Sequence, residues 1–423
     1  MSAVDRRTFL SFTGALVAPL AFPLAAGATQ TASAAQTADA APAAAARAAG
    51  AAQAAGAPKA PGPHTGRIIV NALGSLDDPN LDLDPKTPRG APSKSNPTPN
   101  SEEDPFTERV LREAHASGLT AVNVTLGYVA GDMEPYEATI RDIARTDAAI
   151  RLHANDLIKV YSAADIRRAA SERRIGIIYG FQNAQMMGHD ATRVDTFGGL
   201  GVRVIQLTYN PANPLGDGSM APGNRGLTAF GREVVERLNA NRIMVDLSHS
   251  GEHTCLDAAR ASRQPISINH TGCRALTDLP RNKTDEELRL VAERGGFVGI
   301  YFMPFLKTDG HASAADVVAH IEHAVNVCGE DHVGIGTDGS VTSIDDLDAY
   351  RAVLAKEIEA RRAAGISAAG EGPDTFPFVV DLRGVNQFHE LTARLQSRGF
   401  ASSRIDRILG LNFLRFAKDV WGS

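Results

Sequence analysis

The stretches RIMVDLSHS (242–250) and PISINHT (265–271) decide the fold that this sequence predicts. Each is a short apolar run that ends beside a histidine, and 21 residues separate His249 from His270. That spacing fits one strand, one helix and the next strand, so the two imidazoles should lie side by side where neighbouring parallel strands end. A third run, DHVGIGTDG (331–339), ends beside Asp338. Such residues at the carboxyl ends of several strands are typical of a site in a parallel barrel.

Other runs of the same kind precede and separate these three. They are rich in Val and Ile, and they are continuously apolar rather than alternating, which is typical of parallel strands covered on both faces. They are residues 68–74, 119–128, 174–182, 201–209 and 295–303. Amphipathic stretches with apolar residues three or four apart lie between the runs and predict helices. These are residues 107–118, 162–173, 232–241, 252–262, 285–295 and 314–329.

Eight strands that alternate with helices over roughly 275 residues predict an α/β fold, a (β/α)8 TIM-type barrel. A doubly wound open sheet is the alternative, but no G-x-G-x-x-G follows the first run, so a dinucleotide site has no support. The stretches 389–399, 402–410 and 412–422 predict extra C-terminal helices outside the barrel. Two long loops, 76–104 and 210–226, should emerge on the face that carries the site, where they could cover it.

The amino-terminal residues predict a targeting segment. Residues 1–28 contain the pair Arg6-Arg7, a short apolar stretch and a small-residue cleavage-like site, which together indicate a twin-arginine signal peptide. A membrane anchor is the alternative, but the apolar stretch is short and contains two prolines. We therefore expect export through the twin-arginine route, with the protein periplasmic or secreted.

The remaining chain divides into a linker and one domain. Residues 29–63 are almost wholly Ala, Gly, Pro, Thr and Gln, which predicts a disordered Ala/Pro-rich linker, and residues 64–423 form the predicted barrel domain. No later segment approaches the roughly 20 apolar residues of a membrane span, so we expect no stable span in the mature chain.

The composition limits which partners and which cross-links are expected. The net charge of −6 is mild, and no dense basic stripe appears, so nucleic acid is not expected as a partner. Three cysteines, Cys255, Cys273 and Cys328, do not make a disulfide framework. Three buried thiols are the simpler interpretation, although one pair remains open.

The strand-end residues have the chemistry of a metal hydrolase site. Two imidazoles on adjacent strands can share one metal ion, although a single strand-end histidine is usually just hydrogen-bonded. The carboxylate of Asp338 can move a proton at a metal-bound water or bind the metal, or it can cap a helix. The planar fork of Arg281, in the loop after the sixth run, suits a substrate carboxylate or a surface salt bridge.

Several segments together resemble the membrane dipeptidase (renal dipeptidase) family of zinc peptidases. The resemblance covers about residues 66–421, and its most specific parts are 226–249, 268–288, 320–339 and the closing 391–400 and 407–416. It implies a (β/α)8 barrel, a dipeptide substrate and a zinc cofactor, and it leaves room for a homodimer. It also implies roles for four residues. His249 and His270 resemble two ligands of the family's second zinc. Asp338 resembles the acidic residue that handles the proton in peptide cleavage. Arg281 resembles the arginine that receives the dipeptide's C-terminal carboxylate.

Other family positions are altered. The family's first-strand His and Asp, which bind the first zinc, correspond to Leu73 and Ser75, and its bridging glutamate corresponds to Gln182. An amide oxygen is a much weaker zinc ligand than a carboxylate, so a two-metal site is not expected. Tyr209 stands where the family has a substrate-binding histidine, and we predict that it contacts substrate. Replacement ligands from Asp77, Asp78 or His64 remain open.

The sequence therefore predicts an exported metal-dependent hydrolase of the membrane dipeptidase type. It would cleave dipeptides or a similar small amide or ester with a metal-activated water, using one zinc ion rather than two. The alternative is a catalytically inactive barrel that binds a small peptide-like ligand.

Overall fold

The structure, a computed structural model, describes residues 66–80, 104–372 and 374–422. The predicted signal peptide (1–28) and linker (29–63) lie outside the described residues, as do His64 and most of the loop after the first strand.

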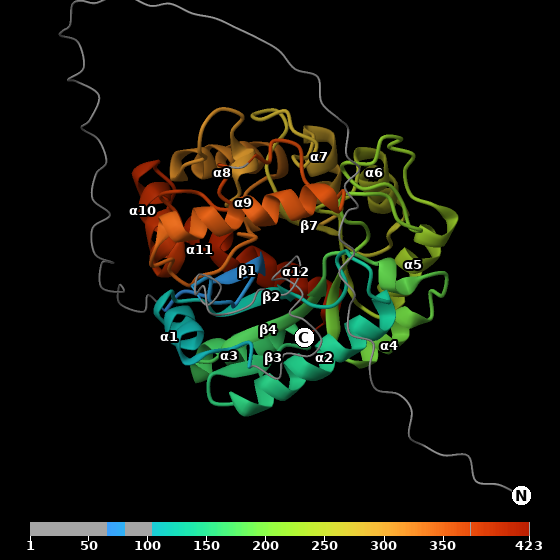
Figure 1. The fold of residues 1–423 in the computed structure, drawn as a ribbon, viewed down its shortest axis with the longest axis horizontal. Coiled ribbons are helices and arrows are strands. Elements are labelled where there is room, and N and C mark those ends of the chain that lie inside the picture. Colours follow the sequence, from blue (N-terminus) through green and yellow to red (C-terminus); the bar gives the residue numbers. More distant parts are fainter. Residues whose placement is uncertain (1–65, 81–103, 373, 423) are drawn as a thin grey trace, which may run out of the picture. The chain divides into compact units, whose positions relative to one another are not determined.

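A parallel sheet lies at the centre of the described chain (Figure 1). Its neighbours are hydrogen-bonded in the order β1-β2-β4-β5-β6-β7-β8-β9, and β3 pairs with β4 off this path. Eight strands follow one another around the sheet with helices between them, so the predicted (β/α)8 barrel is confirmed. The strands are β1 (Val70–Gly74), β2 (Ala121–Thr125), β3 (Leu157–Lys159), β4 (Ile175–Phe181), β5 (Val202–Gln206), β6 (Met244–Asp246), β7 (Ser267–Thr271), β8 (Phe297–Ile300) and β9 (Val333–Ile335).

The barrel closes where the chain after β9 meets β1. The N–H of Asp338 donates to the carbonyl oxygen of Leu73 at 2.9 Å. Nearby, the side chain of Asn71 donates to Oγ1 of Thr337 at 2.8 Å and accepts from the N–H of Thr337 at 2.8 Å. These bonds connect the first and last strands and fix the backbone that carries Asp338.

Helices surround the strands and follow them in sequence (Figure 1). The six helices predicted between strands are all present, with ends that differ by a few residues. The helices are α1 (Glu108–Ala116), α2 (Pro135–Leu152), α3 (Ala163–Glu172), α4 (Arg193–Gly199), α5 (Ala229–Ala240), α6 (Glu252–Ala261), α7 (Asp285–Glu293), α8 (Ala314–Cys328), α9 (Leu347–Ala363), α10 (Gln387–Ser397), α11 (Ser402–Asp406) and α12 (Asn412–Trp421). A π-helical turn, Arg407–Leu411, joins α11 to α12.

Local sequence signals explain where several helices begin. At α7, the Thr284 side chain accepts from the N–H of Glu287, and the Glu287 carboxylate accepts from the N–H of Thr284. Such reciprocal bonds satisfy N–H groups that the first helical turn would leave without partners. The same capping box starts α3 and α8.

The C-terminal helices cover one end of the barrel. Aromatic residues of α12 pack on the first residues of β1, β2, β6 and β8 in one buried cluster. The rings of Phe413 and Phe297 meet edge to face with centroids 5.3 Å apart, and Phe413 also packs on Trp421. Because these contacts are at the amino ends of the strands, the carboxyl ends remain available for a site.

A different helix covers the carboxyl ends. Helix α9 follows β9 and crosses that face of the barrel (Figure 1). Its buried residues, Leu354 and Ile358, form a small cluster with Phe376 that is separate from the main core. We call α9 and the segment 374–384 the roof.

The structure differs from the sequence-based expectation in two respects. Strand β3 and helices α2, α4 and α9 were not predicted, since β3 has only three residues and α9 is rich in Ala and charged residues. The observed strands are shorter than the apolar runs. For example, the run 242–250 becomes β6 (Met244–Asp246), because its later residues form the loop that carries His249.

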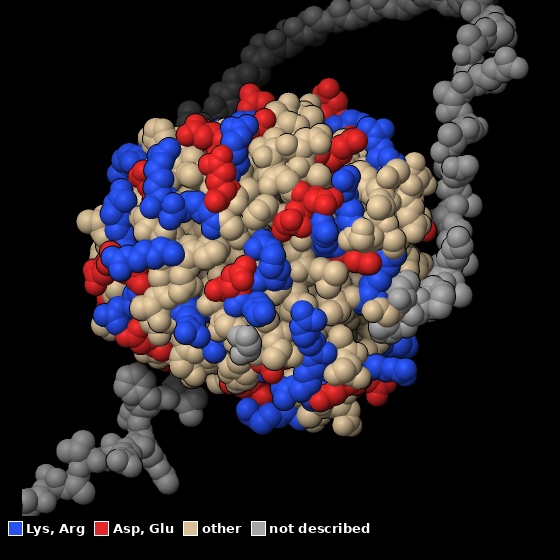
Figure 2. All heavy atoms as spheres, turned by 180° about the vertical axis from the view of Figure 1, so that it is seen from behind, with Lys and Arg blue, Asp and Glu red and all other residues tan. Residues whose placement is uncertain are grey.

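The surface and the cysteines add two findings. Positive and negative side chains are interspersed over the face in Figure 2. No helix among the described residues is both long and apolar enough to cross a bilayer. Cys255, Cys273 and Cys328 are free and buried, as the simpler interpretation predicted.

The packing of α12 predicts a large effect of one substitution. Phe413 is 1% exposed, so Phe413→Ala should lower the free energy of unfolding by about 3–5 kcal/mol. Leu411→Ala, at a residue that is 39% exposed in the adjoining turn, is the matched control and should change it little. Denaturant unfolding measures both, and equal effects would contradict the packing described.

Candidate active site

Two histidines lie side by side at the carboxyl ends of β6 and β7. The ring centroids of His249 and His270 are 4.9 Å apart, with planes tilted by 58°. Ser248 connects the two segments, because its hydroxyl donates to the carboxylate of Asp246 at 2.5 Å and accepts from the N–H of His270 at 3.1 Å. The predicted convergence of these imidazoles is therefore observed, while their role as metal ligands stays a prediction.

The surroundings keep both imidazoles neutral. Burial holds the pKa of His249 well below its usual value, and the nearby cation of Arg281 lowers it further. Burial and Arg281 act on the pKa of His270 in the same direction. A neutral imidazole has one lone pair, which is what a metal ion or a hydrogen-bond donor needs.

The two histidines differ in their hydrogen bonds. Nδ1 of His249 donates to Oδ1 of Asn210 at 2.7 Å, so its Nε2 carries the lone pair and accepts from Nη2 of Arg281 at 3.2 Å. His270 is fully buried, and neither of its ring nitrogens has a hydrogen-bond partner among the described residues. An orphaned buried imidazole indicates a site for a group that the polypeptide does not supply.

Arg281 is buried beside this pair. It is 2% exposed, its Nη1 donates to the carbonyl oxygen of Ser248 at 2.5 Å, and its guanidinium lies 5.8 Å from the ring centre of Tyr301. The surface salt bridge considered for Arg281 is therefore wrong. Its predicted role as a carboxylate receptor stays a prediction, and in this conformation its guanidinium is bonded to the protein itself.

Asp338 lies across from His270 after β9. Its Oδ2 is 3.9 Å from Nε2 of His270, and 21% of its side-chain surface is exposed. Burial raises the pKa of Asp338 to about 6, against the opposing effect of Arg281 and Arg361. Its backbone φ of 57° is left-handed, which is unusual for a residue with a side chain and is frequent at functional sites. The helix N-cap considered for Asp338 is not observed.

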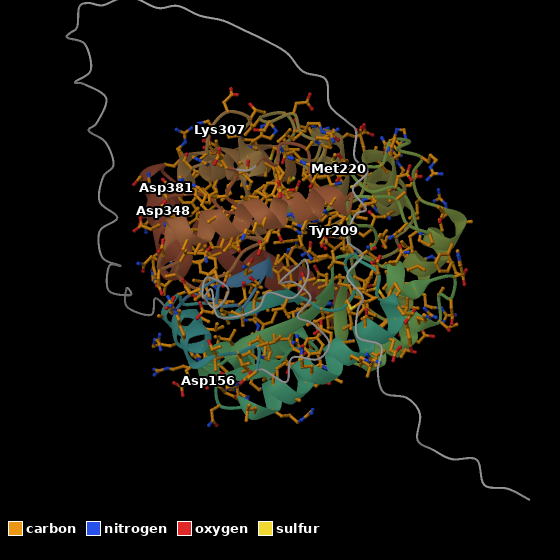
Figure 3. All side chains as sticks on the ribbon, in the orientation of Figure 1. Asp156, Tyr209, Met220, Lys307, Asp348 and Asp381 are labelled. Atoms are coloured by element: carbon orange, nitrogen blue, oxygen red, sulfur yellow. The ribbon has the colours of Figure 1, made fainter. Side chains whose placement is uncertain are left out.

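A cavity of about 640 Å³ opens over Asp338. Tyr209 and Asp338 line it, and Tyr209 stacks on His249 with centroids 4.3 Å apart. Tyr209 follows β5 and lies near the carboxyl ends of the strands (Figure 3). His249, His270 and Arg281 do not line the cavity. Tyr209 therefore covers His249, and Asp338 is the predicted reactive group that a ligand in the cavity would meet.

The residues at the altered family positions make contacts within the protein instead. Leu73 is buried and supplies only its carbonyl oxygen, which accepts from Asp338. The hydroxyl of Ser75 donates to the carboxylate of Asp77. The amide of Gln182 donates to Oγ1 of Thr125 at 2.8 Å, and Gln182 does not line the cavity.

The residues that were considered as replacement ligands are only partly available. Asp77 lines the cavity at the end of β1. Asp78 accepts from the N–H and side chain of Asn80 at 3.0 and 2.7 Å. His64 lies outside the described residues.

The described residues limit how a metal ion could be held at this site. Within the described ranges, no three His, Cys, Asp or Glu side chains are grouped closely enough to enclose an ion. The neutral pair of His249 and His270 has the donor chemistry for one ion, and the orphaned nitrogens of His270 support it. His249 can contribute only after Arg281 has left its Nε2.

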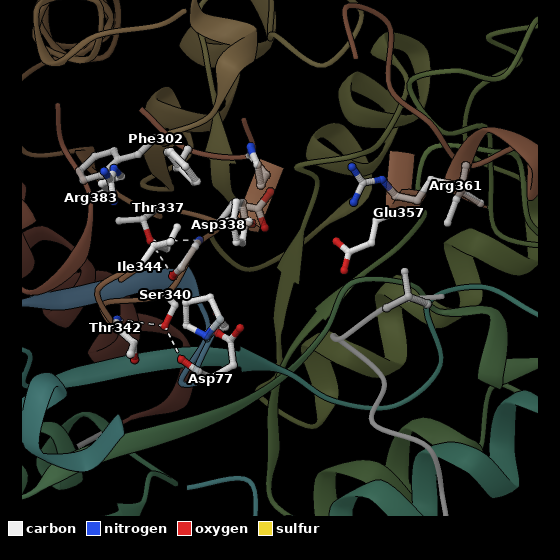
Figure 4. A pocket seen from close by; sticks show the side chains of 18 of the residues that line it. Asp77, Phe302, Thr337, Asp338, Ser340, Thr342, Ile344, Glu357, Arg361 and Arg383 are labelled. Carbon is white, nitrogen blue, oxygen red and sulfur yellow. Dashed lines mark hydrogen bonds between the residues drawn. The ribbon is translucent and has the colours of Figure 1, made fainter. Parts of the chain in front are cut away.

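The sequence did not reveal the residues of the roof that line the cavity. These include Tyr350, Glu357 and Arg361 of α9 and Phe378 and Arg383 after it (Figure 4). These residues do not lie at the carboxyl end of a strand, which is the position that identified the other candidate residues. The available signal was weak: within 347–363, Leu354 and Ile358 stand four residues apart, as on one helix face.

Comparison with known proteins identifies the family. A model of the membrane dipeptidase family, peptidase family M19, matches residues 107–367. The chain belongs to this family. Membership makes it a hydrolase of the dipeptidase type and implies a metal cofactor.

Individual relatives agree with this assignment. An amidohydrolase from Pseudomonas aeruginosa is 31% identical, with a TM-score of 0.67 over 85% of this chain and 98% of its own. A dipeptidase from Claviceps purpurea is 25% identical over 286 residues, which are 67% of this chain and 60% of that protein. A metallopeptidase from Rhodobacter sphaeroides, bound to a phosphinate mimic of the dipeptide L-Ala-D-Ala, is 20% identical with a TM-score of 0.63 over 84% of this chain and 100% of its own. This last likeness shows the fold alone.

The raised pKa of Asp338 predicts a stability that depends on pH. The pKa of Asp338 is about 6 in the folded protein, against an ordinary value of 3.8. The free energy of unfolding therefore falls as pH rises from the ordinary pKa through about 6, because the buried carboxylate is costly. Asp338→Asn avoids that cost. It should therefore be more stable than the wild type at pH 8 by about 1–3 kcal/mol, the upper value being the full shift.

The same substitution should give a much smaller charge-related gain at pH 4, where the carboxyl of the folded wild type is still protonated. Thermal unfolding at both pH values, with a chelator present, measures the difference. Asn also tolerates the left-handed backbone better than most residues, and that gain would be equal at both pH values. A stability difference that does not grow with pH would contradict the raised pKa.

Proposed function

We propose that this chain hydrolyses a dipeptide or a similar small amide or ester in the cavity above Asp338, with one metal ion. The observation that carries the proposal is the position of Asp338, which lines the cavity and lies 3.9 Å from the unpartnered His270. The family supplies the general reaction type, and the donors that this chain retains support one ion rather than two.

Asp338 has the properties of a proton carrier. A carboxyl with a pKa of about 6 is mostly ionised at neutral pH, so it can accept a proton from the attacking water. It is also basic enough to hold that proton and to give it to the leaving amine. Its free side-chain surface faces the cavity, where both steps would take place.

Tyr209 is suited to orient the substrate carbonyl. Burial and the nearby Asp338 raise the pKa of Tyr209 to about 12, so the phenol stays protonated at neutral pH. A protonated phenol can donate a hydrogen bond to a carbonyl oxygen and to the negative charge that develops on it. Its stacking on His249 restricts where the hydroxyl can point.

A metal ion, held by His270 and by His249 once Arg281 has moved, would polarise the carbonyl and lower the pKa of a bound water. We propose zinc, because imidazole suits it. The neutral state of both histidines leaves their lone pairs free for this role.

One specific contact favours a second candidate function. Arg281 occupies Nε2 of His249, and Tyr209 covers the same ring, so this conformation resembles a closed site. The second candidate is a catalytically inactive barrel that binds a small peptide-like ligand in the same cavity.

A peptidase assay with metal analysis separates the two candidates. The wild type, incubated with zinc and dialysed, should retain about one ion per chain and cleave dipeptides. His270→Ala should lose the ion, and Asp338→Asn should lower kcat by about a hundredfold or more because the proton carrier is gone.

His253→Ala provides a matched control, since His253 is exposed on α6 four residues after His249. It should keep both the ion and the activity. A wild type that retains no metal and cleaves no dipeptide would favour the inactive barrel. Activity that persists in His270→Ala and Asp338→Asn would refute the proposed site.

We also propose that the protein is exported by the twin-arginine route, on the basis of Arg6-Arg7 and the apolar stretch that follows. Replacement of both arginines by lysine should leave the protein in the cytoplasm, since the paired arginines are the recognised signal. Cell fractionation with an antibody against the barrel domain measures it. Unchanged export of the double variant would contradict this route.

A further inference from the structure

The cavity has more room than a small dipeptide needs. Its volume of about 640 Å³ lies within the range of roughly 300–1,000 Å³ typical of cavities that enclose drug-sized ligands. A dipeptide of two small residues would fill only the part next to Asp338. The walls farther from Asp338 can therefore select among substrates.

One side of the cavity is apolar. Phe302 and Ile344 line it beside Asp338, and Phe378 and Leu382 of the roof belong to the same lining. Figure 4 shows Phe302, Ile344 and Arg383 together on one side of Asp338, with Glu357 and Arg361 on the other. A bulky apolar group of a ligand would be removed from water by binding to this apolar side, next to Arg383.

The two arginines that line the described cavity differ in their partners. Arg361 forms an ion pair with Glu371. Arg383 forms no ion pair with any acidic residue in the described part of the chain. Its Nε donates to the carbonyl oxygen of Val380 at 3.3 Å, and its guanidinium carbon lies 5.3 Å from the centre of the Phe378 ring.

The environment of Arg383 is costly for a charge without a counter-ion. The residue is half-buried, and burial lowers its pKa. A guanidinium with free Nη groups in such a wall is suited to receive an anion, and the fork of an arginine matches a carboxylate with two parallel hydrogen bonds. Packing on Phe378 holds the fork in place.

Arg281 is less well placed for the same task. It does not line the cavity, and its Nη groups are already bonded to Ser248 and His249. A substrate carboxylate could bind it only if those bonds broke.

We propose that Arg383, rather than Arg281, receives the free carboxylate of the substrate, and that Phe302, Ile344 and Phe378 hold the apolar side chain next to it. The substrate class is then a dipeptide with a bulky apolar C-terminal residue and a free carboxylate. This inference rests on the proposed function for its reaction, and on the cavity alone for its binding.

The test compares Arg383→Met with the wild type on two substrates, a Gly-Phe dipeptide and the corresponding C-terminal amide. Arg383→Met should raise KM for the free dipeptide by about tenfold or more, because a charge-assisted hydrogen bond is lost. KM for the amide should change little, since the amide has no carboxylate to lose. Arg383→Lys should recover part of the difference.

Two further variants make the comparison specific. Arg351→Met is the matched control, because Arg351 also lies over an aromatic ring of the roof, 5.1 Å from the centre of Phe376, but does not line the cavity. It should leave both KM values unchanged. Arg281→Met should not reproduce the selective loss. Thermal unfolding of each variant shows that it is folded.

The outcomes separate this inference from the proposed function. A selective loss in Arg281→Met with none in Arg383→Met would overturn the inference and leave the hydrolase proposal intact. If the wild type cleaves nothing, the hydrolase proposal fails, and calorimetric binding of Gly-Phe decides the inference. Binding that Arg383→Met weakens supports it, while equal binding, or none to the wild type, overturns it.

Discussion

The closure of the barrel between its last and first strands is the constraint on which the site depends. The hydrogen bond from the N–H of Asp338 to Leu73 holds the last strand-end segment against β1, and the paired bonds between Asn71 and Thr337 support it from below. Together they keep Asp338 in a left-handed conformation that a flexible loop would abandon. The carboxylate thus reaches the cavity because the backbone beneath it has no freedom to relax.

Buried cationic side chains shape the electrostatics around the two histidines. Arg281 and Lys283 are both buried near the histidines and lower the pKa of each. Positive charge is therefore already present beside both imidazoles. Two carboxylates that the family has are missing, since Ser75 and Gln182 stand at their positions.

The sequence predicted the barrel and the neighbours within the site well, because both follow from position along strands. His249, His270 and Asp338 were identifiable since parallel strands bring their carboxyl ends to one face. The roof could not be predicted in the same way. Arg383 follows no strand, and its place in the cavity depends on how a long segment folds back over the barrel. Nor could spacing reveal that Arg281 bonds to His249, since that contact depends on side-chain packing.

The separate cluster beneath α9 has a consequence for turnover. Leu354, Ile358 and Phe376 pack on one another outside the main core, so lifting this helix exposes few of the contacts that stabilise the barrel. Local opening of such a unit costs much less free energy than global unfolding. The roof and the barrel beneath it can then fluctuate on different timescales. Opening of this helix would then set how readily a ligand enters and leaves the cavity, separately from any reaction below it.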